Sequence, residues 1–220
     1  KIQANMNPRH RDRAVFVRIV SGVFERDMQV VDQRTGKKVR LANAQKLFGQ
    51  GRETLDTAYA GDVLALVGNY DFLIGDTLTS DPKVTYNEMP RFTPECFAYI
   101  LNSDTAAVKR YRSGMAQLMK EGVAQAYTVH GSSQAVPMLG AVGPLQFEVL
   151  QARLESEYKV ETRLESPQWS VVQWFDENEP DTMRREQDPP QVNLPSGAAV
   201  ARDQDGNWVG LLSSKDMTSI

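Results

Sequence analysis

A short run of basic residues near the start of the chain carries the side chains best suited to binding an anion. Residues 9–13 read Arg-His-Arg-Asp-Arg, and the candidate contacts are Arg9, His10, Arg11 and Arg13. A guanidinium group presents a planar fork of donors that matches phosphate oxygens, so this run predicts contacts to phosphate groups. The alternative is a solvated surface loop in which Asp12 pairs with an arginine. The sequence leaves both interpretations open.

No residues in the sequence are spaced for nucleotide hydrolysis. That chemistry requires a glycine-rich loop ending in Gly-Lys-Ser or Gly-Lys-Thr, which holds the phosphates, and an aspartate for magnesium. The nearest glycine cluster, Gly49-Gln50-Gly51-Arg52, lacks that ending and is predicted to be a simple turn. A nucleophile-elbow sequence is also absent. We therefore expect no catalytic residue and no bound cofactor in this chain.

The potential metal ligands do not follow a recognisable metal-binding pattern. Asp203, Asp205 and Gly206 match the start of a calcium loop, but position 214, where that loop needs glutamate, is serine. His10 and His130 fall in different predicted domains, and one cysteine with two histidines cannot complete a structural zinc site. We expect solvated histidines and no metal site.

Length and composition describe a globular chain of one or two domains. It has 220 residues, of which 41% are hydrophobic, enough for a core in each domain. No stretch approaches the roughly 20 apolar residues that cross a bilayer, and the start lacks the apolar segment of a secretory signal. Cys96 alone cannot form an internal disulfide, so a reducing cytoplasm is the expected compartment. The net charge of −3 indicates that any RNA contact is local.

The first part of the sequence predicts a small, mainly β domain, a closed or partly closed barrel over residues 1–82. From Lys1 to Met6, Ile2 and Ala4 alternate with polar residues as in a strand. From Ala14 to Val20 both faces of an alternating pattern are partly apolar, which is typical of a central strand. Shorter runs follow, separated by glycine, aspartate and asparagine turns. The expected short strands are Met28–Asp32, Lys38–Leu41, Ala44–Phe48, Val63–Val67 and Thr77–Thr79.

Residues 83–94, which include Pro90 and Pro94, are the expected linker. Beyond it, residues 95–220 predict an α+β domain in which strand, helix, strand, strand, helix and strand follow in the ferredoxin-like order βαββαβ. Asp104 is the expected N-cap of the first helix. The second helix should start at Pro144 and bury a stripe that includes Leu154.

A C-terminal extension is expected after the ferredoxin-like core. Trp169–Phe175 reads as a strand, and Ala198–Arg202 and Trp208–Leu212 flank an Asp-Gly pair that favours a hairpin turn. Lys215–Ile220 could begin a further helix.

Several motifs resemble a known family. FVRIVSG at 16–22, AYAGDV at 58–63 and IGDTL at 74–78 are similar to the barrel found second in translational GTPases. The segment 140–161, GAVGPLQFEVLQARLESEYKVE, resembles the third domain of the same group. Leu145-Gln146-Phe147 and the loop 9–13 are closest in form to the bacterial class-II release factors, the peptide chain release factor 3 family, rather than to elongation factor G.

The resemblance implies a function that composition and spacing do not. In that family the intact protein is a GTPase that docks on the terminating ribosome and promotes the recycling of class-I release factors. The resemblance therefore implies that GTP and magnesium bind in an N-terminal domain outside this chain. The implied partners are the ribosome, through rRNA and small-subunit proteins, the class-I release factors functionally, and the protein's own GTPase domain, with no membrane.

Two alternatives stay open. An elongation-type translational GTPase would share the scaffold but differ at the loop 9–13 and at Leu145-Gln146-Phe147. A free-standing interaction module could use both domains without any GTPase. A phosphate-binding loop upstream of Lys1 would favour the release-factor interpretation, and its absence would favour the module.

Overall fold

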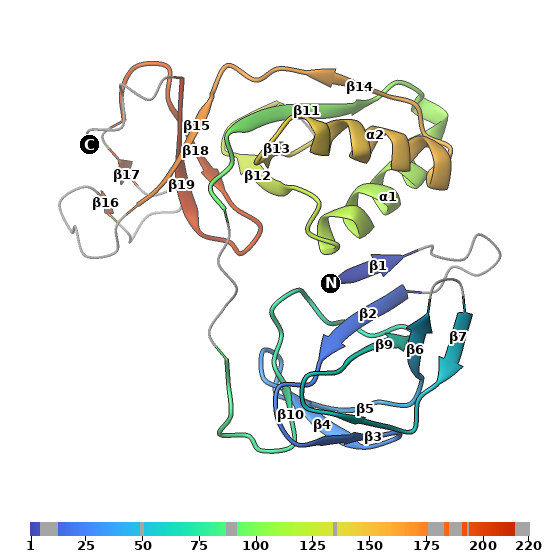
Figure 1. Ribbon diagram of the computed structural model, residues 1–220. Coiled ribbons are helices and arrows are strands. Elements are labelled where there is room, and N and C mark those ends of the chain that lie inside the picture. The colour runs from blue at the N-terminus through green and yellow to red at the C-terminus, as the bar shows by residue number, and fades with distance from the viewer. Residues whose placement is uncertain are drawn as a thin grey trace. The chain divides into compact units, whose positions relative to one another are not determined.

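The computed structural model describes residues 1–4, 13–48, 51–86, 92–133, 136–175, 183–184, 191–192 and 194–213 (Figure 1). The chain divides into two compact units. The first contains residues 1–90 together with Lys120–Gly122, and the second contains the remainder.

The first unit is built from short antiparallel strands in three sheets. The largest sheet has the order β1 (Ile2–Ala4), β2 (Arg13–Arg18), β9 (Val63–Val67), β6 (Ala44–Phe48) and β7 (Gly51–Thr54). A second sheet contains β10 (Leu78–Thr79), β4 (Gln29–Asp32) and β5 (Lys37–Arg40), and a third pairs β3 (Val23–Glu25) with β8 (Thr57–Tyr59).

All three sheets contribute to a single core. Ile2 and Leu66 come from the large sheet, Val30 from the second, and Phe24 and Ala58 from the smallest, and all are at most 5% exposed. Sheets that enclose a common apolar interior form a barrel-like domain, which confirms the predicted β-barrel class.

Three barrel strands were not predicted, and each has a local reason. β3 and β8 bury only their central residues, Phe24 and Ala58, so neither shows an extended alternation. β7 has the sequence Gly-Arg-Glu-Thr and carries no apolar residue. Because Gly51 pairs with Phe48, the predicted turn Gly49–Arg52 is wrong at Gly51 and Arg52, which belong to β7.

The second unit contains a seven-stranded antiparallel sheet in the order β14-β11-β13-β12-β18-β19-β15. The first four positions hold the fourth, first, third and second strands of the βαββαβ series, which is the ferredoxin-like arrangement. This confirms the predicted α+β class. Its elements are β11 (Cys96–Asn102), α1 (Val108–Lys120), β12 (Gln125–Val129), β13 (Met138–Ala141), α2 (Leu145–Tyr158) and β14 (Thr162–Glu165).

Both helices pack on one face of this sheet (Figure 1). Asp104 caps a short 3-10 turn, Thr105–Ala107, by accepting a hydrogen bond from the Ala106 amide at 2.8 Å, and α1 follows directly. Pro144 is the N-cap of α2, and Lys159 ends it in the left-handed conformation with φ 57°.

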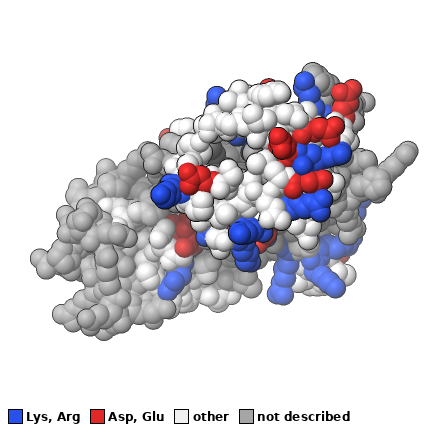
Figure 2. Space-filling view, turned by 90° about the horizontal axis from the view of Figure 1, so that it is seen from below, with Lys and Arg blue, Asp and Glu red and all other residues white. Residues whose placement is uncertain are grey.

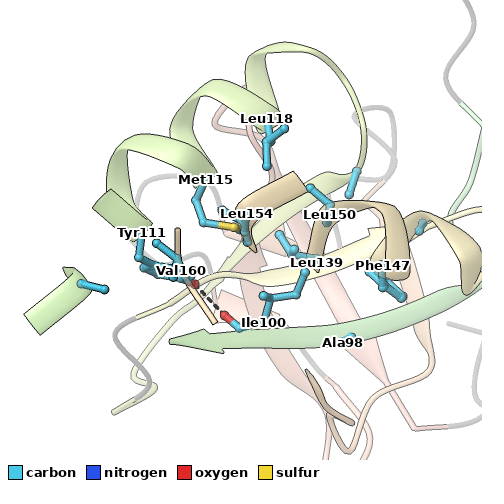
Figure 3. Packing of buried hydrophobic residues seen from close by; sticks show 13 residues of the cluster. Ala98, Ile100, Tyr111, Met115, Leu118, Leu139, Phe147, Leu150, Leu154 and Val160 are labelled. Carbon is cyan, nitrogen blue, oxygen red and sulfur yellow. Dashed lines mark hydrogen bonds between the residues drawn. The ribbon is translucent and has the colours of Figure 1, made fainter. Parts of the chain in front are cut away.

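The core beneath the helices joins α1 and α2 to β11 and β13 (Figure 3). Leu118 of α1, Leu150 and Leu154 of α2 and Leu139 of β13 are fully buried. The Tyr111 hydroxyl donates a 2.6 Å hydrogen bond to the Ile100 carbonyl, which is the dashed line in Figure 3. This bond satisfies the polar end of a largely buried aromatic side chain.

The C-terminal extension lengthens the sheet and also packs against the sheet face that lies opposite the two helices. β15 (Val171–Trp174), β18 (Ala199–Arg202) and β19 (Trp208–Leu212) continue the sheet beyond β12. A second core cluster joins Tyr127 and Met138 of the ferredoxin-like strands to Val209 and Leu211 of β19. The predicted hairpin is present, with Arg202 opposite Trp208, whereas Lys215–Ile220 lies outside the described residues. β16 (Met183–Arg184) and β17 (Gln191–Val192) pair as a small separate sheet.

Candidate functional site

The basic run is carried on the connection between two paired strands. Ala4, the last residue of β1, lies opposite Arg13, the first residue of β2. Arg9, His10 and Arg11 fall between them and outside the described residues, so their contact with RNA stays a prediction.

Arg13 is the described member of this run, and its guanidinium is turned to the barrel itself. Nη1 donates to the Tyr70 carbonyl at 2.8 Å, and Nη2 donates to the Phe72 carbonyl at 2.6 Å. The rings of Tyr70 and Phe72 stack at 5.2 Å, and the Tyr70 hydroxyl accepts a 3.2 Å bond from the Ala42 amide. Arg13 therefore holds the segment that follows β9 against the start of β2.

Partial burial changes the electrostatics of this arginine. Desolvation lowers the pKa of the Arg13 guanidinium, and the nearby Asp71 partly offsets that effect. Nε of Arg13 is buried and has no hydrogen-bond partner among the residues that the structure describes. A partly buried guanidinium that donates two hydrogen bonds to backbone carbonyls stabilises the barrel itself.

A second arginine, Arg34, binds the segment that follows β9 at Asp71 and Asp76. Arg34 makes a two-pronged contact with Asp76, from Nε to Oδ1 at 2.8 Å and from Nη2 to Oδ2 at 3.0 Å, and donates to the Asp71 carbonyl at 2.8 Å. The hydrogen bond to Asp76 raises the pKa of Arg34. Asp76 also accepts from the Leu73 amide at 2.7 Å. The IGDTL motif thus contains an aspartate that fixes the loop geometry.

Asp203, the first aspartate of the calcium-like sequence, accepts hydrogen bonds from within the protein. Asp203 accepts hydrogen bonds from the Trp174 indole at 3.1 Å, the Asn207 amide at 2.8 Å and the Asp205 amide at 2.9 Å. Burial alone would raise the pKa of Asp203, but these hydrogen bonds outweigh it and the net shift is downward. The carboxylate oxygens of Asp203 therefore link the turn of the β18–β19 hairpin to Trp174 of β15. Among the described residues there is no group of three or more His, Cys, Asp or Glu placed to hold a metal ion.

His130 packs against an aromatic side chain. Its ring lies edge-on to Trp208 with centroids 6.1 Å apart, while the Arg202 guanidinium lies 4.2 Å from the Trp208 centroid. The Arg202–Trp208 contact is a cation–π pair between directly opposed residues of neighbouring strands.

A concentration of positive charge on α1 was not predicted from the sequence. Its 13 residues, VKRYRSGMAQLMK, contain four basic residues and no acidic one, although the whole chain carries a net charge of −3. Lys109, Arg110 and Arg112 are exposed. The signal was present in the sequence as a local charge imbalance, but the run at residues 9–13 is denser and stands out more.

The face of the molecule drawn in Figure 2 mixes both signs of charge. Figure 2 shows lysine and arginine side chains next to aspartate and glutamate side chains on one face, with uncharged surface between them. Ion pairs such as Arg26–Asp56 at 3.2 Å and Arg40–Asp27 at 3.2 Å contribute to this pattern. Within the described part of the chain, no helix has the length and apolar character needed to cross a membrane.

Two family models together match almost the whole chain. The model of the class II release factor RF3 C-terminal domain matches residues 86–219, and the model of elongation factor G domain 2 matches residues 1–81. The boundary between the matches lies close to the division between the two compact units.

Curated relatives named peptide chain release factor 3 are similar over most of the chain. The protein of Cyanothece sp. is 49% identical over 180 residues, which cover 82% of this chain and 33% of that protein. The protein of Synechocystis sp. is 49% identical over 174 residues, which cover 79% and 32% respectively. The chain therefore spans about a third of the length of the curated relatives it matches.

A solved structure shares the fold. A protein from Thermus thermophilus superposes with a TM-score of 0.59 at 15% sequence identity, covering 87% of this chain and 28% of that one. At this identity the likeness shows the fold and nothing more.

Proposed function

Since the chain belongs to the class II release factor family, we propose that its two units form the ribosome-docking part of a translation termination GTPase. The proposed role is to promote the recycling of class-I release factors from the ribosome after the finished peptide has been freed. The observation that carries the proposal is the match of a class II release factor model across the second unit, beside a translation-factor barrel in the first. That combination favours a release factor over the elongation-type alternative.

The proposed contacts to ribosomal RNA are Arg9, His10 and Arg11. These residues connect two strands that are paired through Ala4 and Arg13, so the paired strands β1 and β2 anchor both ends of the connection. Arginine side chains at such a place suit phosphate oxygens. Arg13 is left out of the proposed contact, because its terminal nitrogens bind the Tyr70 and Phe72 carbonyls.

We assign no nucleotide chemistry to the residues of this chain. Its sequence lacks a phosphate-binding loop, and it spans about a third of its relatives. GTP and magnesium are therefore proposed to bind in a further domain of the full-length protein. The proposed partners are rRNA and small-subunit proteins, the GTPase domain itself, and functionally the class-I release factors, all in the cytoplasm.

The test measures how fast a labelled class-I factor leaves terminated ribosomes when the full-length protein that contains these residues is added with GTP. The expected result is faster departure with the protein than without it. Unchanged departure, together with stimulated translocation on elongating ribosomes, would reject the proposal in favour of the elongation-type alternative. Unchanged departure without any ribosome binding would favour the free-standing module.

The loop is tested by ribosome binding at several salt concentrations. Arg9→Ala and Arg11→Ala should each weaken binding and reduce the slope of log affinity against log salt by about 1, because each removes one phosphate contact. An exposed arginine elsewhere on the barrel, Arg18, supplies the control Arg18→Ala, which removes the same charge. Equal slopes for all variants would reject the loop as a contact and leave the termination role to be judged by the first assay.

A further inference from the structure

Helix α1 presents a side to solvent that carries only basic and uncharged residues. Lys109, Arg110 and Arg112 are exposed, and so are Ser113 and Ala116. The buried side of the helix holds Tyr111, Gly114, Met115 and Leu118, of which the three larger side chains pack into the core of the second unit. Because the buried residues fix the rotation of the helix, the charged side chains point away from the sheet.

The positions of these cations are not explained by helix stability. The helix dipole favours acidic side chains in the first turn and basic ones in the last. The first turn of α1 contains no acidic residue and instead carries Lys109 and Arg110. In the described part of the chain, Lys109, Arg110 and Arg112 have no ion pair. At least one ion pair is present at each of five other arginines, Arg26, Arg34, Arg40, Arg153 and Arg163.

The basic side of α1 also differs from the exposed side of its neighbour α2. There Glu148 and Glu155 are exposed, and Arg153 is already paired with Glu157. The positive charge therefore belongs to one helix and does not extend over the whole helical layer. A local cluster of this kind on an acidic chain is the electrostatic footprint of a polyanion site.

We propose that the exposed side of α1 binds the phosphate backbone of structured RNA through Lys109, Arg110 and Arg112. The Ser113 hydroxyl adds a neutral donor on the same side, of a kind that commonly binds phosphate and sugar oxygens. Such a site contributes affinity and register without reading sequence. The inference deepens the proposed ribosome docking, on which it rests, by giving the second unit an RNA contact separate from the loop of the first.

The experiment measures binding of the whole chain to a labelled RNA hairpin by fluorescence anisotropy over a range of salt concentrations. The test variant combines Lys109→Gln, Arg110→Gln and Arg112→Gln. The control variant combines Lys37→Gln, Lys38→Gln and Lys83→Gln, three exposed lysines of the first unit, and so makes the same change in net charge. Circular dichroism melts of all three proteins confirm that each is folded.

For the wild type, the slope of log affinity against log salt should be steeper by about 2.7 than for the test variant, because three phosphate contacts contribute about 0.9 each. Between about 50 and about 200 mM salt, the wild type should then lose about 40-fold more affinity than the test variant does. The control variant should follow the wild type. These differences need neither GTP nor a class-I factor, so they are independent of the recycling assay.

Two results would overturn the inference. One is a wild type whose RNA affinity and slope are no different from those of the test variant, including the case in which none of the proteins binds. The other is that, in the same assay, polyglutamate binds the wild type more tightly than the test variant while the RNA hairpin binds neither. That result would identify an acidic protein as the partner. Recycling activity that persists beside either result would leave the proposed termination role standing.

Discussion

Gly114 of α1 lies directly against Leu154 of α2. A Cβ atom built on Gly114 would stand 2.8 Å from Leu154 Cδ2 and 2.9 Å from Tyr158 Cγ. The two helices thus approach each other at a point that leaves no room for a methyl group. Leu154 is fully buried, so the contact lies within the core of the second unit.

Gly114→Ala should therefore lower the melting temperature of the second unit. In an open helix interior the same change stabilises by up to about 1 kcal/mol through helix propensity. Here the added methyl group overpacks the interface, which typically costs about 1 to 3 kcal/mol. Thermal denaturation beside the neighbouring Ser113→Ala, on the exposed side, checks the expectation. A melting temperature above that of the wild type would show that the helices separate easily.

Leu154→Ala should cost about 2 to 5 kcal/mol in the free energy of unfolding, because it empties a fully buried position. Leu145→Ala makes the same chemical change on the same helix at a side chain that is 66% exposed, and should cost less than about 0.5 kcal/mol. Urea denaturation of both variants gives the comparison. Similar losses at the two positions would mean that α2 packs with a different face.

The buried apolar stripe of α2 was predictable from the sequence, because Phe147, Leu150 and Leu154 recur at the spacing of a helix that buries one face. The barrel was predictable as a class but not strand by strand, since β3 and β8 each bury a single side chain. The C-terminal hairpin followed from its Asp-Gly turn. That the added strands cover the second face of the sheet depends on long-range packing, which no local pattern encodes.

The candidate contact residues illustrate the limit for function. In the sequence, Arg13 looks like its neighbours in a basic loop, yet its guanidinium binds the carbonyls of Tyr70 and Phe72, far along the chain. Sequence spacing cannot separate an arginine that serves the fold from one that serves a ligand. The basic side of α1, by contrast, was visible as a charge imbalance once the helix was placed.

Tyr111 should make stability depend on alkaline pH. Burial raises the pKa of its hydroxyl to about 12 from its ordinary value of 10.0. The folded state therefore keeps a proton that the unfolded state loses, and stability that is fully present below about pH 10 declines as the pH rises towards about 12. Urea denaturation at about pH 9 and about pH 11 should show a smaller decline for Tyr111→Phe than for the wild type. Tyr86→Phe, at an exposed tyrosine, is the control, and a decline in Tyr111→Phe equal to that of the wild type would contradict the assignment.

The linker predicted at residues 83–94 should allow the chain to be separated. A cut after Tyr86 keeps β10 with its partner β4, and leaves β11 and the rest of the second sheet together. Each piece then retains its own apolar cluster and should melt cooperatively. Calorimetry of the two purified pieces tests this. A piece without a cooperative transition would mean that its core depends on the other unit.

Arg13→Gln should destabilise the first unit, because the Tyr70 and Phe72 carbonyls lose charged donors at 2.8 Å and 2.6 Å. Leaving partly buried carbonyls without those donors should cost about 1 to 3 kcal/mol. Arg18→Gln removes an exposed arginine from the same strand and should cost no more than about 0.5 kcal/mol. Denaturation followed by the fluorescence of the barrel piece, which contains Tyr70 and no tryptophan, isolates the effect from the second unit. The opposite outcome is that Arg13→Gln leaves stability unchanged and reduces the slope of log affinity for the ribosome against log salt, as expected for Arg9→Ala. Arg13 would then be an RNA-binding residue and not a structural residue of the barrel.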